Sequence, residues 1–122
     1  MAGLAAAVAD VLNAFAGRDF RGHPIRVTDD SNVVVPPCVW VPMPALTFQF
    51  AKGCVDVVWT AYLIAPNTNT TSVSETLSGL LDAVTGLFPF REGTAQPLTL
   101  PGGGQPAPSY QVTWNARIPI GA

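Results

Sequence analysis

The chain has 122 residues, which fits one domain, and it carries a formal net charge of −2 with a pI of about 5.0. The six basic residues are scattered, which excludes the basic footprint of a nucleic-acid-binding protein, and no uninterrupted apolar stretch of about 20 residues predicts a transmembrane helix. Charged residues make up only 11% of the chain, against about 25% in an ordinary soluble domain, and we infer that partners cover much of the surface.

The first predicted element is an amphipathic helix over residues 3–16. Apolar side chains recur at helical spacing on one face, and Gly17 ends the pattern. The same segment is a poor secretory signal, because no Lys or Arg precedes its apolar stretch and Asp10 interrupts it. Export is therefore not expected. The apolar face consists of Leu4, Val8, Val11, Leu12 and Phe15.

Several short strands are predicted after this helix. They are rich in β-branched and aromatic residues and are separated by turn residues such as Gly22-His23-Pro24. Prolines cannot donate to a strand ladder, so the segment around Pro36-Pro37 is expected to lie at a sheet edge or to be kinked. The predicted strands cover residues 25–28, 33–35, 38–41, 46–50 and 54–65.

The longest predicted strand, 54–65, is apolar on both faces. Every second residue from Val55 to Leu63 is apolar, as in a half-buried strand. The opposite face is too apolar for full exposure and is expected to meet either more of this chain or a partner. The apolar residues on that opposite face, which we predict to be interface residues, are Val58, Tyr62 and Ile64.

A second helix is predicted over residues 72–88. Ser72 and Glu75 match a capping box, and the helical spacing runs up to Pro89, which ends it. A Gly/Pro-rich stretch follows at about 91–109, too long and too rich in apolar residues for a plain hairpin turn, and it is interpreted as an extended loop. The residues of this loop that we predict to contact a neighbour are Leu98, Leu100, Gly102, Gly103 and Gly104.

The last predicted strand, 110–120, alternates between apolar and polar residues along its whole length. The order of elements is therefore helix, several strands, helix, strand, with links of hairpin length inside the run of strands. This order predicts an α+β fold, a mainly antiparallel sheet with two helices packed on one face. We expect residues 1–122 to form this single domain.

Residues suited to catalysis or metal binding are few. His23 is the only histidine and lies in a turn, and the adjacent Asp29 and Asp30 suit turn hydrogen bonds better than shared acid–base chemistry. Cys38 and Cys54 do not form a C-x-x-C pair and are interpreted as buried thiols, with their redox state left open. We therefore predict no catalytic residue, no cofactor and no metal site, and a protein that is not an enzyme.

Four segments, taken in order, carry a likeness to a known family: the alanine-rich helix ending at Ala16, Pro36-Pro37-Cys38-Val39-Trp40-Val41, the strand from Val55 to Pro66 that runs into a polar loop and a capped helix, and the closing strand from Tyr110 to Ile120. This arrangement resembles the tail-terminator (tail completion) proteins of bacteriophages with long, non-contractile tails. The likeness covers most of the chain as an order of elements rather than as a diagnostic motif.

The resemblance implies a structural virion protein. Such proteins form a ring, usually of six copies, at the head-proximal end of the tail tube, where they end tube polymerisation and present an attachment surface for the head and neck. The implied partners are further copies of the chain, the major tail tube protein and a head-closure or neck protein. DNA is implied only in passage through the lumen, no membrane is involved, and the protein is expected in the virion tail after assembly in the host cytoplasm.

A ring that passes DNA needs a lumen that does not hold it. An acidic or neutral lumen lets a polyanion slide, because positive charge would bind it. On this hypothesis Asp29, Asp30 and Asp56 face the lumen.

Two alternatives remain open at this point. One is another head–tail connector or minor tail protein of the stopper type, which shares the ring but leans toward a small β-barrel. The other is a small ligand-binding domain, with Trp40, Trp59 and Trp114 placed around an apolar pocket.

Overall fold

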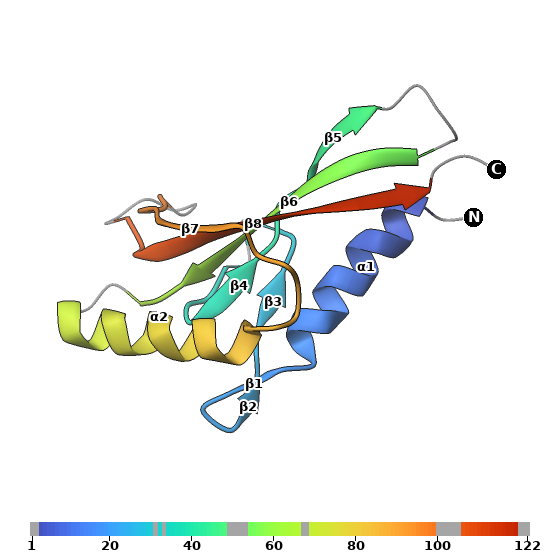
Figure 1. Ribbon diagram of the computed structural model, residues 1–122. Helices are drawn as coiled ribbons and strands as arrows, with labels where there is room; N and C mark the ends of the chain where they lie inside the picture. The colour runs from blue at the N-terminus through green and yellow to red at the C-terminus, as the bar shows by residue number, and fades with distance from the viewer. Residues whose placement is uncertain are drawn as a thin grey trace.

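The protein has two layers, a mostly antiparallel sheet and two helices that cover one of its faces (Figure 1). The computed structural model describes residues 3–30, 32, 34–48, 54–66, 69–99 and 106–119. This arrangement confirms the predicted α+β class. The elements are α1 (Gly3–Ala16), β1 (Asp19–Phe20), β2 (His23–Pro24), β3 (Val27–Thr28), β4 (Cys38–Trp40), β5 (Ala45–Phe48), β6 (Cys54–Ile64), α2 (Thr70–Val84), β7 (Glu92–Ala95) and β8 (Ser109–Pro119).

The sheet is built around the pairing of β6 with β8. The two strands are antiparallel and pair over eleven residues, from Cys54 opposite Pro119 to Ile64 opposite Ser109. Because β8 occupies one edge of β6 along its whole length, β4 and β5 both pair with the other edge. The main path of the sheet is β3-β4-β6-β8-β7, and only the short β3–β4 contact is parallel.

The alternation along β6 and β8 places one set of side chains beneath the helices, on what we call the inner face. Val55, Val57, Ala61 and Leu63 of β6 are fully buried there. This burial follows from the period of two in a strand, which sends alternate side chains to the same side of the sheet. The other side is called the outer face.

An aromatic cluster joins α1 and the segment after α2 to the inner face. Trp59 and Trp114 lie opposite each other in the ladder and stack with ring centroids 6.0 Å apart. Phe88 stacks on Trp114 at 4.6 Å, and Phe15 of α1 meets the same ring edge-on at 6.0 Å. Such pairs add to the apolar area that they bury, so this cluster fixes both helical segments against the centre of the sheet.

Helix α1 begins and ends as the sequence predicts. Its buried residues, Val11 and Phe15, belong to the predicted apolar stripe, and Leu12 packs against the same core. Gly17 follows the helix, and its N–H donates to the carbonyl of Asn13 at 2.9 Å.

Helix α2 differs from the prediction at both ends. It begins at Thr70, with Asn69 as the N-cap, whose Oδ1 accepts a hydrogen bond from the N–H of Ser72 at 2.9 Å. The predicted capping box at Ser72 is therefore wrong, because Asn69 caps the helix first. The helix ends at Val84, since Gly86 takes a positive φ of 86° and turns the chain well before Pro89.

The prediction of a loop over residues 91–109 is wrong for residues 92–95, which form a strand. Strand β7 pairs with β8 from Glu92 opposite Thr113 to Ala95 opposite Tyr110. The hairpin continues beyond β7, where the N–H of Gln96 donates to the Ser109 carbonyl at 2.8 Å and Leu98 bridges to Ala107. Gly93, Thr94 and Ala95 lack apolar alternation, because β7 is an exposed edge strand, so the sequence carries no strand signal there.

The proline-rich segment before β4 does not place that strand at an edge. β4 lies between β3 and β6, and the N–H groups of Val39 and Val41 donate to carbonyls of Arg26 and Thr28. Pro36 and Pro37 precede the strand, so they remove no donor from it. Val34 and Val35 belong to no strand, and the remaining predicted residue of that strand, 33, lies outside the described residues, as do 49 and 50 of the predicted strand 46–50.

The small β1–β2 hairpin docks on α2. A Cβ added at Gly79 would lie only 2.7 Å from Cε1 of Phe20, so only glycine permits this approach of the helix. Arg21 of the hairpin donates to Oγ1 of the buried Thr76 on α2 at 3.1 Å. The hairpin is therefore held against α2 by the packing of Phe20 and by the hydrogen bond of Arg21.

Replacing the N-cap of α2 tests its observed start. We expect Asn69→Ala to lower the free energy of unfolding by about 1 kcal/mol, because it leaves the Ser72 N–H without its acceptor. Ser72→Ala is the matched control and should cost clearly less in the same urea titration. The reverse order of the two variants would show that the capping box at Ser72 operates instead.

Candidate functional site

The residues that suit chemistry are dispersed. His23 lies exposed on β2, beside a small cavity of about 180 Å³ that Arg21 and Arg26 also line. Within the ranges that the structure describes, no three His, Cys, Asp or Glu side chains lie close enough to hold a metal ion. No helix among these residues is long and apolar enough to span a membrane.

The three aspartates predicted to face a lumen do not form one cluster. Asp29 and Asp30 lie exposed just after β3, where Oδ1 of Asp30 accepts a hydrogen bond from the N–H of Asn32 at 2.8 Å. Asp56 lies on the outer face of β6 and forms an ion pair with Nε of Arg117 at 2.8 Å. Thr28, the residue before Asp29, lies in register with Trp40 of β4 and Tyr62 of β6. Tyr62 is six residues along β6 from Asp56, a distance of about 20 Å.

The predicted interface residues on β6 have different surroundings. Val58 is 37% exposed on the outer face, as an interface residue would be in a free subunit. Tyr62 stacks on Trp40 with centroids 5.1 Å apart, and Ile64 is fully buried. The expectation that Ile64 contacts a neighbour is therefore corrected, since its own chain covers it.

The cover over Ile64 comes from the β7–β8 hairpin. Ala107 and the half-buried Leu98 fold back onto the outer face and form a small second core with Ile64 and Cys38. Leu98 is thus engaged within its own chain. The other loop residues predicted to contact a neighbour, Leu100, Gly102, Gly103 and Gly104, lie outside the described residues.

The three tryptophans do not surround a common pocket. Trp59 and Trp114 are 2% and 1% exposed in the main core on the inner face. Trp40 packs with Tyr62 on the outer face. The ligand cage considered from the sequence is therefore not formed.

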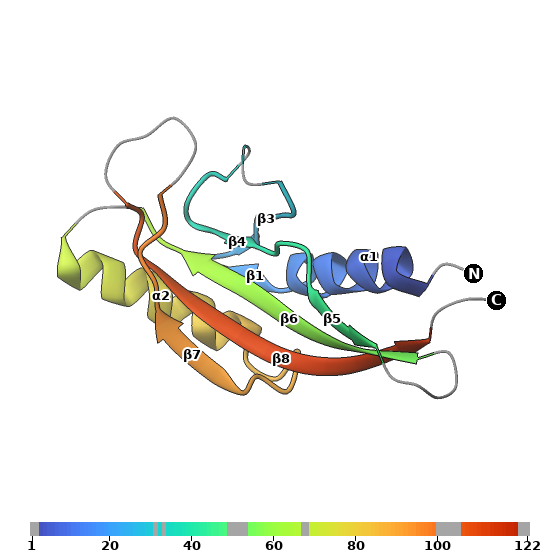
Figure 2. The same ribbon diagram turned by 90° about the horizontal axis from the view of Figure 1, so that it is seen from above.

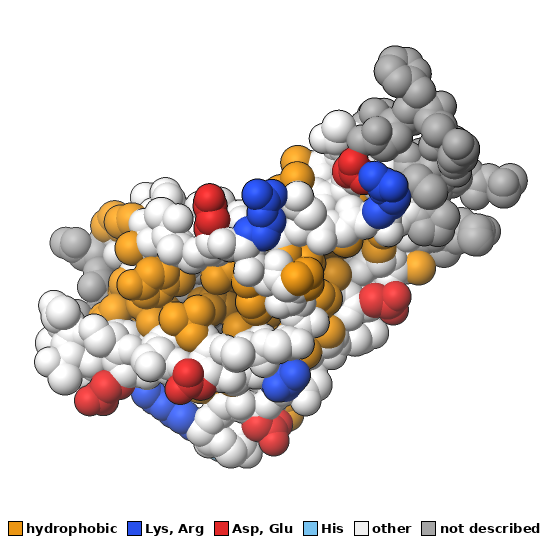
Figure 3. All heavy atoms as spheres, in the orientation of Figure 1, with side chains coloured by type: hydrophobic (Ala, Val, Ile, Leu, Met, Phe, Trp, Pro, Cys, Tyr) orange, Lys and Arg blue, Asp and Glu red, His pale blue; other side chains and the backbone are white. Residues whose placement is uncertain are grey.

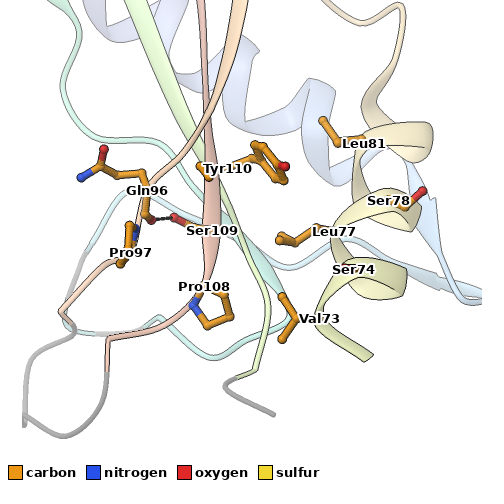
Figure 4. A pocket seen from close by; sticks show the side chains of 11 residues that line it. Val73, Ser74, Leu77, Ser78, Leu81, Gln96, Pro97, Pro108, Ser109 and Tyr110 are labelled. Carbon is orange, nitrogen blue, oxygen red and sulfur yellow. Dashed lines mark hydrogen bonds between the residues drawn. The ribbon is translucent and has the colours of Figure 1, made fainter. Parts of the chain in front are cut away.

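A mainly apolar groove lies between α2 and the β7–β8 hairpin, and Figure 3 shows it as a band of hydrophobic side chains. Its volume is about 390 Å³. Val73, Leu77 and Leu81 of α2 form one wall, as Figure 4 shows. The facing wall, from the hairpin, is formed by Pro97, Pro108 and Tyr110.

The groove is electrically neutral. Its remaining lining residues are Ser74, Ser78, Ala95, Gln96 and Ser109, so no charged side chain contributes to it. The Ser109 hydroxyl donates to the carbonyl of Gln96, which ties the two strands of the hairpin together on that side (Figure 4). A hollow of this size and character fits an apolar segment or ligand rather than an ion.

Sequence reasoning missed this groove. Val73 and Leu81 belong to the apolar stripe of the second helix, and Tyr110 begins the apolar row of the last strand. These three residues are only half-buried in the structure, because the apolar patterns of the helix and the strand extend beyond the core. The wall could be assembled only once β7 was known to pair with β8.

Apolar side chains are also exposed near β4 and β5, which pair with the edge of β6 that faces away from β8. Met43, in the segment between β4 and β5, is 73% exposed, and Leu46 of β5 is 38% exposed. Val35, before β4, is 55% exposed. Strands β3, β5 and β7 each have an edge to which none of the described strands is paired, and β5 and β7 lie on opposite sides of the β6–β8 pair. The molecule therefore carries a groove beside one edge and apolar projections beside the other.

Comparisons of the chain with protein-family models, with curated protein sequences and with solved structures find no significant match.

Burial raises the pKa of the Cys38 thiol to about 11 from an ordinary value of 9.0, and a backbone hydrogen bond at Val35 and the charge of Arg26 oppose this rise only in part. The side chain is 2% exposed, in the small core with Ile64 and Ala107. Because the thiolate is the reactive form, burial and the raised pKa disfavour reaction at Cys38.

The raised pKa of Cys38 predicts a loss of stability at high pH. The unfolded chain loses its thiol proton near pH 9 and the folded chain near pH 11, so stability is fully present below pH 9 and falls between the two values. We expect a decrease of about 2 to 3 kcal/mol over this window. Urea titrations of the wild type and Cys38→Ala across this pH range measure it, and parallel pH profiles for the two proteins would contradict it.

Proposed function

We propose that this chain is a structural virion protein that forms a ring at the head-proximal end of a phage tail tube, ends tube polymerisation and offers an attachment surface for the head and neck. The observation that carries the proposal is that β5 and β7, on opposite sides of the β6–β8 pair, each have one edge without a partner among the described strands, in a chain of which only 11% of residues are charged. The alternation of elements that carries the family resemblance adds support.

A ring needs a particular kind of contact. Each subunit must present one surface to the neighbour on one side and a different surface to the neighbour on the other. The β7 edge, flanked by the groove, and the β5 edge, flanked by Met43, differ in this way. Neighbours at both edges would also account for the exposed apolar residues and for the low share of charge.

The proposed partners follow from the position in the particle. The two ends of a ring meet the major tail tube protein on one side and a head-closure or neck protein on the other. DNA passes through the lumen without being held, for which an acidic net charge is suited. We keep Asp29 and Asp30 as lumen-facing residues in this proposal, because both are exposed at the end of β3.

The proposal predicts that this protein controls tail length. Particles assembled without it should carry tube polymers of irregular length and lack joined heads, because nothing caps the growing tube. Electron microscopy of lysates measures both features. Complementation by the wild type should restore uniform tails, and so should His23→Ala, an exposed control outside the groove and the open edges. Normal tails in its absence would contradict the proposal.

The lumen hypothesis predicts slower DNA ejection when the charge of the loop after β3 is reversed. The double variant Asp29→Lys, Asp30→Lys should slow ejection from purified virions, because added positive charge binds phosphate and does so less at high salt. Glu75→Lys, exposed on α2, is the matched control. Asp56 is left unchanged because its reversal would also break the ion pair with Arg117. Equal ejection rates for the double variant and the control would remove the hypothesis.

A small ligand-binding module is the second candidate, and the groove of about 390 Å³ is the observation that favours it. Native mass spectrometry distinguishes the two functions. A ring of several copies supports the tail protein, whereas a monomer that retains a small molecule, and loses it in Leu77→Trp, supports ligand binding.

A further inference from the structure

We propose that the groove between α2 and the β7–β8 hairpin receives Met43 of a second copy of this chain. This contact would join neighbouring copies in the proposed ring. Only the location of that ring in the virion rests on the proposed function. The contact itself follows from the described residues alone.

Met43 is the most exposed of the large apolar side chains in the part of the chain that the structure describes, at 73%. It stands between Pro42 and Pro44, in the segment that leads into β5. The ring of Pro42 fixes its own φ, and a residue that precedes proline is restricted to extended conformations. The backbone that carries the projection is therefore restricted before docking, which lowers the backbone part of the entropy cost.

The groove matches this projection in chemistry. Both of its walls are mainly apolar, and neither the lining residues nor residues 41–48 include a charged side chain. A methionine side chain is unbranched and adapts to an irregular hollow, and its sulfur makes favourable contacts with aromatic rings such as that of Tyr110. The flanking prolines present further apolar surface to Pro97 and Pro108.

The topology prevents this contact within one chain. Met43 precedes β5, which pairs with the edge of β6 that faces away from β8, whereas the groove lies beyond β8, beside β7 (Figure 2). A projection on one side and its hollow on the other make a heterologous contact when two copies meet. Such a contact leaves one projection and one groove free, so it repeats from copy to copy and gives a ring when the rotation between copies closes.

The same approach brings two open strand edges toward each other. Met43 is followed directly by β5, and the groove is lined by Ala95 and Gln96, where β7 ends. Edge strands with unpaired backbone groups are natural sites of pairing between chains. None of residues 45–48 is charged, so β5 carries no side chain that opposes such pairing.

Disulfide trapping tests the contact directly. One preparation carries Met43→Cys and the other Ser78→Cys, both with Cys54→Ala, and Cys38 is kept because its thiol is buried. Mixing them under mild oxidation should give a linked dimer of one copy of each. Val35→Cys replaces Met43→Cys in the matched control, since Val35 is also exposed and apolar but lies outside residues 41–48. The control should give about tenfold less product, because a disulfide requires Cα atoms within about 7 Å.

Assembly in solution provides the second readout. Met43→Asp should reduce the sedimenting mass to that of a monomer, whereas Val35→Asp should leave it as in the wild type. A trapped yield no higher than that of the control, or full assembly of Met43→Asp, would overturn the inference.

The two proposals fail in different ways. If trapping succeeds while particles made without the protein have normal tails, the contact stands and the tail function falls. If tail length is lost but trapping gives no product above the control, the function stands and another surface joins the copies.

Discussion

The pairing of β6 with β8 over eleven residues is the constraint on which the rest of the structure depends. It sets Trp59 opposite Trp114 and so creates the aromatic surface on which Phe15 and Phe88 pack. A shift of one residue in this register would leave one tryptophan on the inner face and send the other to the outer face. The two helices can cover the inner face only because that register is kept.

The same pairing decides what is left uncovered. The helices use the inner face, and Leu98 and Ala107 of the hairpin cover the part of the outer face around Ile64 and Cys38. Strands β5 and β7 are added at opposite sides and are each open along one edge. The groove beside β7 and the exposed Met43 beside β5 therefore both lie next to strand edges that have no partner among the described strands. This physical picture joins the low charge of the sequence to the assembly that we propose.

Much of this fold is predictable from the residues. Gly17 after an apolar stripe predicts the end of α1, a long run of β-branched and aromatic residues predicts β6, and alternation along the whole strand predicts β8. The start of α2 was harder, because Asn69 and Ser72 lie in a run of several residues that can all cap a helix. Strand β7 carries no local signal, since its stability comes from pairing with β8 across a long connection rather than from its own side chains.

The candidate site belongs to the part that could not be predicted. In each wall of the groove, apolar residues lie at the edge of an apolar pattern that the sequence shows. The sequence does not show that the two walls face each other, because this depends on the pairing of β7 with β8. For Ile64 the sequence suggested a contact that the structure does not need. This apolar residue on the outer face was expected to meet a partner, and Ala107 and Leu98 of the same chain cover it instead. Exposure in the folded chain, rather than apolar character in the sequence, separates Val58 and Met43 from Ile64.

The most direct test of the central claim, that neighbouring copies complete this molecule, is the mass of the purified wild-type protein in solution. Sedimentation velocity over a range of concentrations should show one closed species of several copies, because the proposed ring is a head-to-tail assembly whose rotation closes. A single species of 12.8 kDa at every concentration would contradict the account.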